Sequence, residues 1–386
     1  MEILIFSFTL LVFYLLIEKI LHSKRLNKIP LRISVSGTRG KTSIVRTLAS
    51  VFRSNDIKVL AKTIGSEAKY ILPNGKEELI KRRGMITILE QKKLINKAVK
   101  LKVDCIITEI MSIHPEYHFI ETHKLIKPEL TILSNFRADH TNVVGKSIEE
   151  ISKLFINDIY PSSKILIHEN EINKYLIAGI NKNKSELIKG KKDVAKDLKL
   201  PAVELNQHIS ENLDLVFSAS KYFGINNKTI TKGIINTRLD IGKLVIYKFE
   251  VENKKVYFVN SFAANDPDST TQLIKKTIKI LNLDFPKIIG LMSLRSDRGE
   301  RSQQWLEYLT KNGTDYFNHI FLTGSHSKIL NRKIQASEII KSKDPEHITN
   351  FIISGSDTDS IIFGIANING LGKSLVNYWN KKGTKI

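Results

Sequence analysis

Short apolar runs alternate along this chain with longer segments whose apolar residues recur every three or four positions. Continuous apolar runs between polar residues are typical of strands buried on both faces, and the longer period indicates amphipathic helices. The alternation therefore predicts an α/β fold built on mainly parallel sheets. In the first half it predicts strands at 33–36, 57–62, 103–111 and 129–133, and helices at 41–54 and 88–101.

The pattern also predicts two domains and a boundary between them. A polar, lysine-rich stretch at 181–200 predicts a surface insertion, and the boundary is placed near 238–243. We expect a central domain with a mainly parallel sheet at 30–240. A smaller Rossmann-like α/β domain is expected at 244–386. Within it we predict a β-hairpin at 245–259 turning at 252–254, strands at 287–292, 319–323 and 351–354, and a final helix.

The N-terminus is more apolar than the rest of the chain. Residues 3–17 carry no charge, and a cluster of basic residues follows them, which predicts a membrane anchor at 1–22 with the remainder of the chain in the cytoplasm. The chain would then be a single-pass protein of the cell membrane. A signal peptide is disfavoured because a basic segment before the apolar run and a small-residue cleavage site are both missing. An interfacial or oligomer-forming helix is the alternative, so a homo-oligomer stays possible.

Composition changes this picture in two ways. The formal net charge is +21, but the lysines are scattered and no basic-aromatic stripe of a nucleic-acid module is present, so no nucleic-acid partner is expected. Either a solvated lysine-rich surface or an acidic substrate accounts for the charge. The single cysteine, Cys105, excludes an intrachain disulfide and suits a reducing compartment.

The first predicted strand leads into a phosphate-binding loop. Its residues are Gly37, Thr38, Arg39, Gly40, Lys41 and Thr42. Glycines let backbone N–H groups close on phosphates, Lys41 can reach the terminal phosphates of a nucleotide, and the Thr42 hydroxyl can ligate Mg²⁺. The loop is shorter than the full G-x-x-x-x-G-K-[ST] pattern, which would need a glycine at Val35. The sequence therefore predicts a nucleoside triphosphate site of a shortened type.

Two further polar residues follow buried strands and extend this site. Glu109 ends the run at 103–111, and His140 follows the run at 129–133. Ligands in open α/β sheets bind at the carboxyl ends of strands. We therefore expect Glu109 and His140 to bind a second divalent cation beside the one on Thr42.

The loop, the strand-end glutamate and the Asn-x-x-x-Asp-His segment at 135–140 together resemble the Mur ligase superfamily. Within it, three further segments resemble the poly-γ-glutamate synthases. They are E-I-M-S-I-H-P-E-Y at 109–117, F-A-A-N-D-P-D-S-T at 262–270, and R-S-D-R-G-E-R at 295–301. The likeness extends from about residue 30 to the end of the chain.

This resemblance implies that 30–240 is an ATP-binding domain of the P-loop type and that 244–386 is a C-terminal ligase domain. It also implies an ATP- and Mg²⁺-dependent amide ligase that works through an acyl phosphate and builds γ-glutamyl bonds. The implied partners are glutamate, the growing polymer, and small membrane subunits of a synthase and export complex. Lys41, Glu109, His140 and Arg238 would then be catalytic, with Arg238 contacting the ATP phosphates. Asn265 and Asp268 would face the nucleotide.

The resemblance leaves three points open. Arg295, Arg298 and Arg301 either hold glutamate carboxylates or form a salt-bridged loop with Asp297 and Glu300. The lysine that many Mur ligases carbamoylate corresponds to Phe155 here, and Lys153 is out of register by two residues. A ligase of the Mur or folylpolyglutamate type with another acceptor, and a non-catalytic P-loop component of a membrane complex, are the alternative functions.

Overall fold

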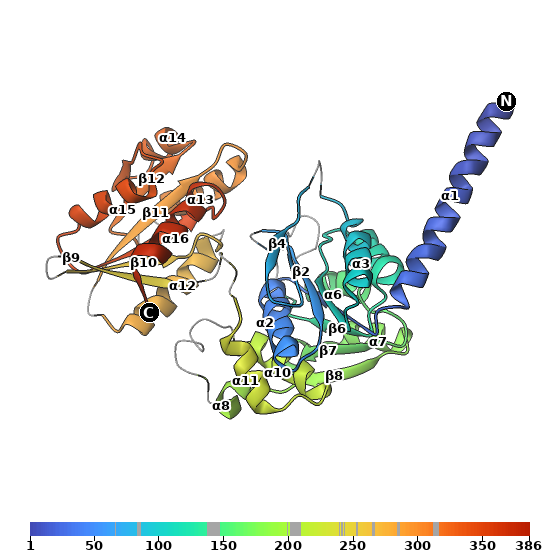
Figure 1. The fold of residues 1–386 in the computed structure, drawn as a ribbon. Helices are drawn as coiled ribbons and strands as arrows, with labels where there is room; N and C mark the ends of the chain where they lie inside the picture. Colours follow the sequence, from blue (N-terminus) through green and yellow to red (C-terminus); the bar gives the residue numbers. More distant parts are fainter. Residues whose placement is uncertain are drawn as a thin grey trace. The chain divides into compact units, whose positions relative to one another are not determined.

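A computed structural model of the chain describes residues 1–65, 67–82, 86–136, 147–198, 200, 210–238, 240, 242, 244–251, 254–264, 267–283, 286–311 and 316–386. The described residues divide into two compact units, Met1–Leu239 and Asp240–Ile386. Each unit contains its own sheet with helices on both faces (Figure 1). The predicted α/β class with parallel-dominated sheets and an N-terminal apolar helix is confirmed.

An eight-stranded sheet forms the centre of the first unit. Its strand order is β4-β3-β2-β5-β1-β6-β7-β8, and all neighbours from β2 to β8 are parallel. The strands are β1 (Leu31–Ser36), β2 (Val59–Thr63), β3 (Lys69–Ile71), β4 (Glu77–Leu79), β5 (Cys105–Glu109), β6 (Leu130–Leu133), β7 (Lys164–His168) and β8 (Glu186–Gly190). The four strands and two helices predicted in the first half are present, with shifts of a few residues at their ends.

Helices cover both faces of this sheet, and successive strand residues alternate between the two cores. Ile107 packs with α2 and α10, for example, whereas Ile106 packs with α3. The helical segments are α1 (Glu2–Leu26), α2 (Lys41–Ser54), α3 (Glu90–Leu101), α4 (Pro115–Ile120), η1 (Glu121–Ile126), α6 (Ile148–Ile156), η2 (Glu169–Glu171), α7 (Lys174–Lys182), α8 (Val194–Leu198), α10 (Ser210–Tyr222) and α11 (Asn227–Ile235).

The predicted surface insertion at 181–200 is wrong. Most of this stretch belongs to the sheet and its cover, because β8 pairs in parallel with β7 and Val194 and Leu198 of α8 are buried in the core. β8 is the last strand at its edge, where one side needs no partner strand, so lysines and glutamates are tolerated. The polar composition reflects this edge position.

Helix α1 has two parts with different surroundings. Residues up to Leu21 are mostly exposed, and the helix runs away from the sheet as the dark blue ribbon of Figure 1. Its last turn is anchored, since His22 contacts the Leu125 carbonyl oxygen at 2.9 Å and Leu26 is buried against α3. The helix is long and apolar enough to cross a membrane, with a mean hydropathy of 2.2 over its most apolar window.

A seven-stranded sheet forms the centre of the second unit, in the order β13-β12-β11-β14-β10-β9-β15. Strands β13 to β10 are parallel, and β9 and β15 are antiparallel to their neighbours. The strands are β9 (Ile246–Val251), β10 (Lys254–Asn260), β11 (Lys287–Leu294), β12 (His319–Gly324), β13 (Ser337–Ile339), β14 (Ser360–Ala366) and β15 (Thr384–Lys385). The helices are α12 (Pro267–Leu281), α13 (Gly299–Lys311), α14 (Ser327–Asn331), α15 (Pro345–Ser354) and α16 (Leu371–Lys382).

The strand predicted at 351–354 is wrong, because these residues end helix α15. Asp344 caps that helix by accepting hydrogen bonds from the N–H groups of Glu346 and His347, and Pro345 occupies its first turn. The central strand of this part is β14, which is buried throughout. The apolar run at 351–354 is the end of an amphipathic helix.

Helices α2 and α11 approach each other closely at a glycine. A Cβ atom on Gly233 would lie 2.4 Å from Cα of Val51, closer than any real contact allows. The absence of a side chain at Gly233 therefore sets the spacing of these two helices.

We predict that Gly233→Ala lowers the free energy of unfolding of the first unit by about 1–3 kcal/mol, because the added methyl group overpacks the helix contact. Urea denaturation followed by circular dichroism measures it. Tryptophan fluorescence serves as an internal reference, since Trp305 and Trp379 both lie in the second unit and their transition is expected to stay unchanged. Gly299→Ala is the control, because a Cβ there meets no atom within 4 Å. Equal effects of the two substitutions would contradict the packing argument.

Candidate active site

The phosphate loop connects β1 to α2 through two glycines in left-handed conformations. Gly37 has φ +107° and Gly40 has φ +89°, so both positions favour glycine on backbone grounds alone. Space excludes a side chain as well, since a Cβ on Gly37 would lie 2.3 Å from Oγ of Ser134. The loop is therefore pressed against the residues that follow β6.

Asn135 holds the loop from the β6 side. Its main-chain oxygen accepts a hydrogen bond from N–H of Thr38 at 3.0 Å. Its side-chain amide accepts from N–H of Arg39 at 3.3 Å and donates to the Arg39 carbonyl oxygen at 2.9 Å. These bonds fix the backbone of the loop. Asn135 appears in the sequence pattern at 135–140, but we did not predict this structural role.

Lys41 and Thr42 lie in the first turn of α2. The Lys41 ammonium reaches back over the loop and donates to the carbonyl oxygens of Gly37 at 2.6 Å and Thr38 at 3.3 Å. A Cβ on Gly65 would lie 2.6 Å from Oγ1 of Thr42, so the chain after β2 passes directly beside that hydroxyl. The loop thus has the cation, the hydroxyl and the helix N-terminus that a nucleotide phosphate requires.

Glu109 lies at the carboxyl end of β5, the strand next to β1, and is 1% exposed. Its Oε1 accepts a hydrogen bond from N–H of Ile64 at 3.2 Å, and its main-chain oxygen accepts one from Nε2 of Gln91 at 3.1 Å. Ile64 precedes Gly65, so the same short segment contacts Glu109 and passes beside Thr42. A carboxylate and a hydroxyl are oxygen ligands that suit Mg²⁺.

The third predicted metal ligand, His140, lies outside the described residues. Within the part of the chain that the structure describes, no three His, Cys, Asp or Glu side chains gather in a metal-binding cluster. Phe155, at the position of the family's lysine, is buried and stacks on Phe136. Lys153 is exposed and pairs with Glu149 of its own helix at 2.6 Å, so its side chain points to solvent.

A buried polar network, which no sequence pattern predicts, lies directly behind the loop. Asp158 accepts hydrogen bonds from Ser36 at 2.5 Å and Thr122 at 3.2 Å, and contacts Nδ1 of His118 at 2.9 Å. Ser36 immediately precedes Gly37, so the network supports the start of the loop. Burial opposes a charge on His118, but the Asp158 carboxylate outweighs it and raises the pKa of the imidazole above its ordinary value.

In the second unit the two sequence motifs lie at the same end of the sheet, where its parallel strands terminate. The 262–270 segment follows the carboxyl end of β10, and the 295–301 segment follows that of β11, with β14 between them. Phe262 of the first motif is fully buried and stacks on Trp379 at 5.8 Å between ring centroids, so it fixes the segment to the core. Asn265 and the side chain of Asp268 lie outside the described residues.

The three arginines of the second motif have different surroundings. Arg295 forms a bidentate pair with Asp297 at 2.9 and 2.7 Å, and this pair lowers the pKa of the Asp297 carboxyl. Arg301 donates to Oδ1 of Asn367 at 2.6 Å, at the end of β14. Arg298 is exposed. The Arg295–Asp297 pair is part of the salt-bridged alternative, while Arg298 is directed to solvent at the strand ends.

Arg238 lies beside the first half of α2, where it contacts Arg46. Its carbonyl oxygen accepts a hydrogen bond from Nη1 of Arg46 at 3.2 Å, and its charge acts on Arg53. Arg238 also lines a basic hollow together with Arg46 and Arg53. Its predicted contact with the ATP phosphates stays a prediction.

We predict that His118→Gln destabilises the first unit more at pH 6 than at pH 9. The raised pKa means that the protonated imidazole favours the folded state; this stabilisation is complete below the ordinary value of 6.5 and is lost as pH rises through the folded pKa. Urea denaturation followed by circular dichroism at both pH values measures the difference. His123→Gln is the control with the opposite sign, because burial lowers the pKa of His123. A His118→Gln effect that grew with pH would contradict the Asp158 pairing.

Two family comparisons agree with this geometry. Residues 35–227 match the Mur ligase middle domain, and residues 246–382 match the poly-gamma-glutamate synthase CapB C-terminal domain. The first match contains the phosphate loop and Glu109. The second contains both strand-end motifs of the second unit.

Two curated relatives carry related names. The capsule biosynthesis protein CapB of Bacillus anthracis is 28% identical over 301 residues, which cover 76% of this chain and 64% of the relative. The PGA synthase CapB of Bacillus subtilis (strain 168) is 26% identical over 374 residues, covering 94% of this chain and 93% of the relative. The chain thus spans just under two thirds of the first relative and nearly all of the second.

Solved structures share the fold at low identity. FolC of E. coli in complex with DHPP and ADP has a TM-score of 0.65 at 13% identity, covering 93% of this chain and 92% of its own. The bifunctional folylpolyglutamate synthase/dihydrofolate synthase of Yersinia pestis, complexed with AMPPNP and Mn ion, has a TM-score of 0.66 at 12% identity, covering 94% and 92%. The chain belongs to the Mur ligase family, and its C-terminal domain is of the poly-γ-glutamate synthase CapB type.

Proposed function

We propose that this protein is an ATP-dependent ligase that forms γ-glutamyl amide bonds and lengthens poly-γ-glutamate. The observation that carries the proposal is the placement of the phosphate loop beside Glu109, on adjacent strands of a sheet that matches the Mur ligase middle domain. The match of the second unit to the CapB C-terminal domain supports glutamate as the monomer. The name of the Bacillus subtilis relative, PGA synthase, supports the same product.

The reaction proposed for the site has two steps. A glutamate carboxylate oxygen attacks the γ-phosphorus of ATP, the bond to the ADP oxygen breaks, and an acyl phosphate forms. The amine of the next glutamyl unit then attacks the acyl carbon, the C–N bond forms, phosphate leaves with the electron pair of the C–O bond, and the amine loses a proton to water. Both steps carry large negative charge, which fixed cations stabilise best.

Each described site residue has a role in these steps. The loop N–H groups and the N-terminus of α2 bind the β- and γ-phosphates, and Lys41 neutralises the charge on the transferred phosphoryl group. Asn135 and the His118–Asp158 network keep the loop backbone in place before the nucleotide arrives. This pre-organisation lowers the cost of ordering the loop during the reaction.

Thr42 and Glu109 fit the two neighbouring divalent cations that the sequence predicts, one cation at each residue. The segment of Ile64 and Gly65 lies beside both, and the missing side chain at Gly65 leaves room next to the Thr42 hydroxyl. Thr42 would hold one divalent cation, and Glu109 and His140 would hold a second one beside it. When bound, Mg²⁺ would supply positive charge against the phosphate oxygens and the substrate carboxylate.

The same proposal places the enzyme at the cytoplasmic face of the cell membrane. The apolar part of α1 is exposed along most of its length, and basic residues follow it. The anchored last turn, with the Lys92–Glu18 ion pair at 2.7 Å, would hold the catalytic domain close to the lipid surface. There it would meet small membrane subunits that handle the polymer.

We predict that deleting residues 2–17 moves the protein from the membrane fraction to the soluble fraction and leaves the first unit folded, because Glu18, His22 and Leu26 are kept. Fractionation of cell lysates measures the distribution, and circular dichroism measures the fold. The full chain treated in the same way is the control. A shortened chain that stays with membranes through a salt wash would contradict the anchor.

We predict that Lys41→Ala lowers glutamate-dependent phosphate release at least about a hundredfold, the scale of losing one charge-stabilising group in the transition state. The assay follows phosphate and polymer formation from ATP, Mg²⁺ and glutamate by purified full-length protein in detergent. Lys58→Ala is the matched control, because Lys58 is exposed and lies outside the loop.

Two outcomes would contradict the proposal. Survival of activity in Lys41→Ala would remove the loop from the reaction. ATP turnover that ignores glutamate and responds to another amino acid or acceptor would favour a ligase of the folylpolyglutamate or Mur type.

A further inference from the structure

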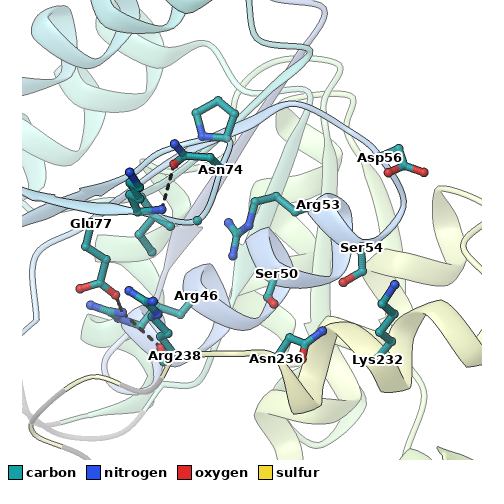
Figure 2. Close-up of a pocket in the computed structure, with 14 residues that line it drawn as sticks. Arg46, Ser50, Arg53, Ser54, Asp56, Asn74, Glu77, Lys232, Asn236 and Arg238 are labelled. Atoms are coloured by element: carbon teal, nitrogen blue, oxygen red, sulfur yellow. Dashed lines mark hydrogen bonds and ion pairs between the residues drawn. The ribbon is translucent and has the colours of Figure 1, made fainter.

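A basic hollow lies on the first unit, and the residues that form the phosphate loop do not line it. Its volume is about 560 Å³, within the roughly 300–1,000 Å³ typical of ligand sites. It lies between residues 46–54 of α2, the turn that joins β3 to β4, and the end of α11 (Figure 2). The lining residues that carry charge are Arg46, Arg53, Lys76, Lys232 and Arg238, with Asp56 and Glu77 as the acidic members.

Helix packing builds the hollow. The close approach of Gly233 to Val51 brings Lys232 and Asn236 of α11 beside Ser50 and Ser54 of α2. Figure 2 shows these side chains along the lower edge of the hollow. They add an ammonium, an amide and two hydroxyl groups to the guanidinium groups of α2.

The β3–β4 turn closes the hollow from above. Gly75, with φ +79°, lets the chain reverse, and a Cβ there would lie 3.7 Å from Nε of Arg53. In Figure 2 Arg53 reaches from α2 toward this turn, which also carries Asn74. The Arg53 guanidinium is thus held between the helix and the turn.

The positive charge of the hollow exceeds what its acidic residues neutralise. Glu77 is shared by Arg46 at 2.5 Å and Lys69 at 3.0 Å. Burial and the charge of Arg238 lower the pKa of the Arg53 guanidinium. Within the described part of the chain, Nη1 of Arg53 is buried without a hydrogen-bond partner, and an unsatisfied buried donor of a charged group is costly. An anion in the hollow would satisfy this donor.

The lining chemistry favours carboxylates over a nucleotide. Guanidinium groups bind carboxylates through two parallel hydrogen bonds. Among the described residues that line the hollow, Ile71 and Pro73 are the large apolar ones and none is aromatic, so a nucleobase would find no ring to stack on. The hollow is therefore suited to a polar chain that carries several carboxylates.

Helix α2 connects the hollow to the phosphate loop, because it begins at Lys41 and also carries Arg46 and Arg53. Arg46 and Arg53 lie five and twelve residues after Lys41, about 8 and 18 Å along the axis of α2. An extended chain of ordinary residues covers about 18 Å in five or six residues. γ-Linked glutamyl units have two more main-chain atoms each, so fewer units span the same distance.

We propose that this hollow binds the carboxylates of glutamyl units several residues away from the end of the polymer that reacts. The inference rests on the proposed function, since it takes the polymer to be the substrate that grows at the phosphate loop. Such a site would favour longer acceptors over short ones, because γ-linked diglutamate with one end at the reaction centre would not reach Arg53. It would keep the growing chain on the enzyme between additions.

The test measures binding without catalysis. Full-length protein in detergent, without ATP, is titrated into fluorescent γ-linked hexaglutamate, and anisotropy gives Kd. Lys232→Glu is expected to weaken binding about ten- to a hundredfold, the range for losing one hydrogen bond to a charged group. Lys93→Glu is the matched control, because it changes the net charge equally but lies exposed on α3, on the opposite face of the sheet. Its Kd is expected to stay within about twofold of the unmodified chain, as distant exposed charges are screened by salt.

A second variant and two competitors make the result specific. Arg53→Gln, checked by circular dichroism for an unchanged fold, is expected to weaken hexaglutamate binding as Lys232→Glu does. Unlabelled hexaglutamate should displace the probe, whereas γ-linked diglutamate and inorganic phosphate should do so only at much higher concentrations. Equal Kd values for Lys232→Glu and Lys93→Glu, or displacement by phosphate at the concentration of hexaglutamate, would overturn the proposal.

Ligation measured on the same proteins separates this proposal from the proposed function. If wild-type protein ligates glutamate but Lys232→Glu and Arg53→Gln bind hexaglutamate normally, the polymer site proposed in the hollow is wrong and the proposed ligase function stands. If the hexaglutamate binds with the expected variant effects but no ligation occurs, the carboxylate site stands and the ligase is wrong.

Discussion

The parallel alignment of β5, β1 and β6 is the constraint on which the candidate active site depends. Because the carboxyl ends of parallel strands lie at the same end of the sheet, the order β5-β1-β6 places Glu109 on one side of the phosphate loop and Asn135 on the other. The loop has no strand partner of its own and takes its shape from these neighbours. Its glycines, its helix N-terminus and Lys41 can act together because the residues around them hold the backbone.

The buried His118–Asp158 pair extends this constraint below the loop. Asp158 bonds Ser36, the last residue of β1, so the loop is fixed from the sheet side as well as from Asn135. A buried carboxylate with three hydrogen-bonding neighbours is costly to assemble but rigid once formed. The same rigid helix that begins at the loop carries the basic hollow, and so the proposed polymer site and the reaction centre keep a fixed distance.

The fold and the loop could be predicted from the sequence because their signals are local. The strand–glycine–Lys-Thr order predicts helix α2 from its first residue, Lys41, and continuous apolar runs predict the central strands. The prediction was wrong where the same local sequence pattern fits both a strand and a helix. The apolar run at 351–354 fits a strand or a helix end, and the cap at Asp344 and Pro345 decides between them. Strand β8 was missed because an edge strand tolerates charges.

The support of the site could not be predicted, since it joins residues far apart in the chain. His118 and Asp158 are 40 positions apart, and neither belongs to a recognisable motif. Arg53, Gly75 and Lys232 likewise meet only after α2, the β3–β4 turn and α11 are packed. Sequence patterns indicate single elements, whereas these contacts depend on how the elements lie together.

Transfer of carboxylate oxygen to phosphate tests the central claim most directly. Acceptor labelled with oxygen-18 in the carboxylate that reacts is incubated with full-length protein, ATP and Mg²⁺, and the released phosphate is analysed by mass spectrometry. An acyl phosphate predicts that each new amide bond delivers one labelled oxygen atom to phosphate. Amide formation with unlabelled phosphate, or with the label in AMP, would contradict the account.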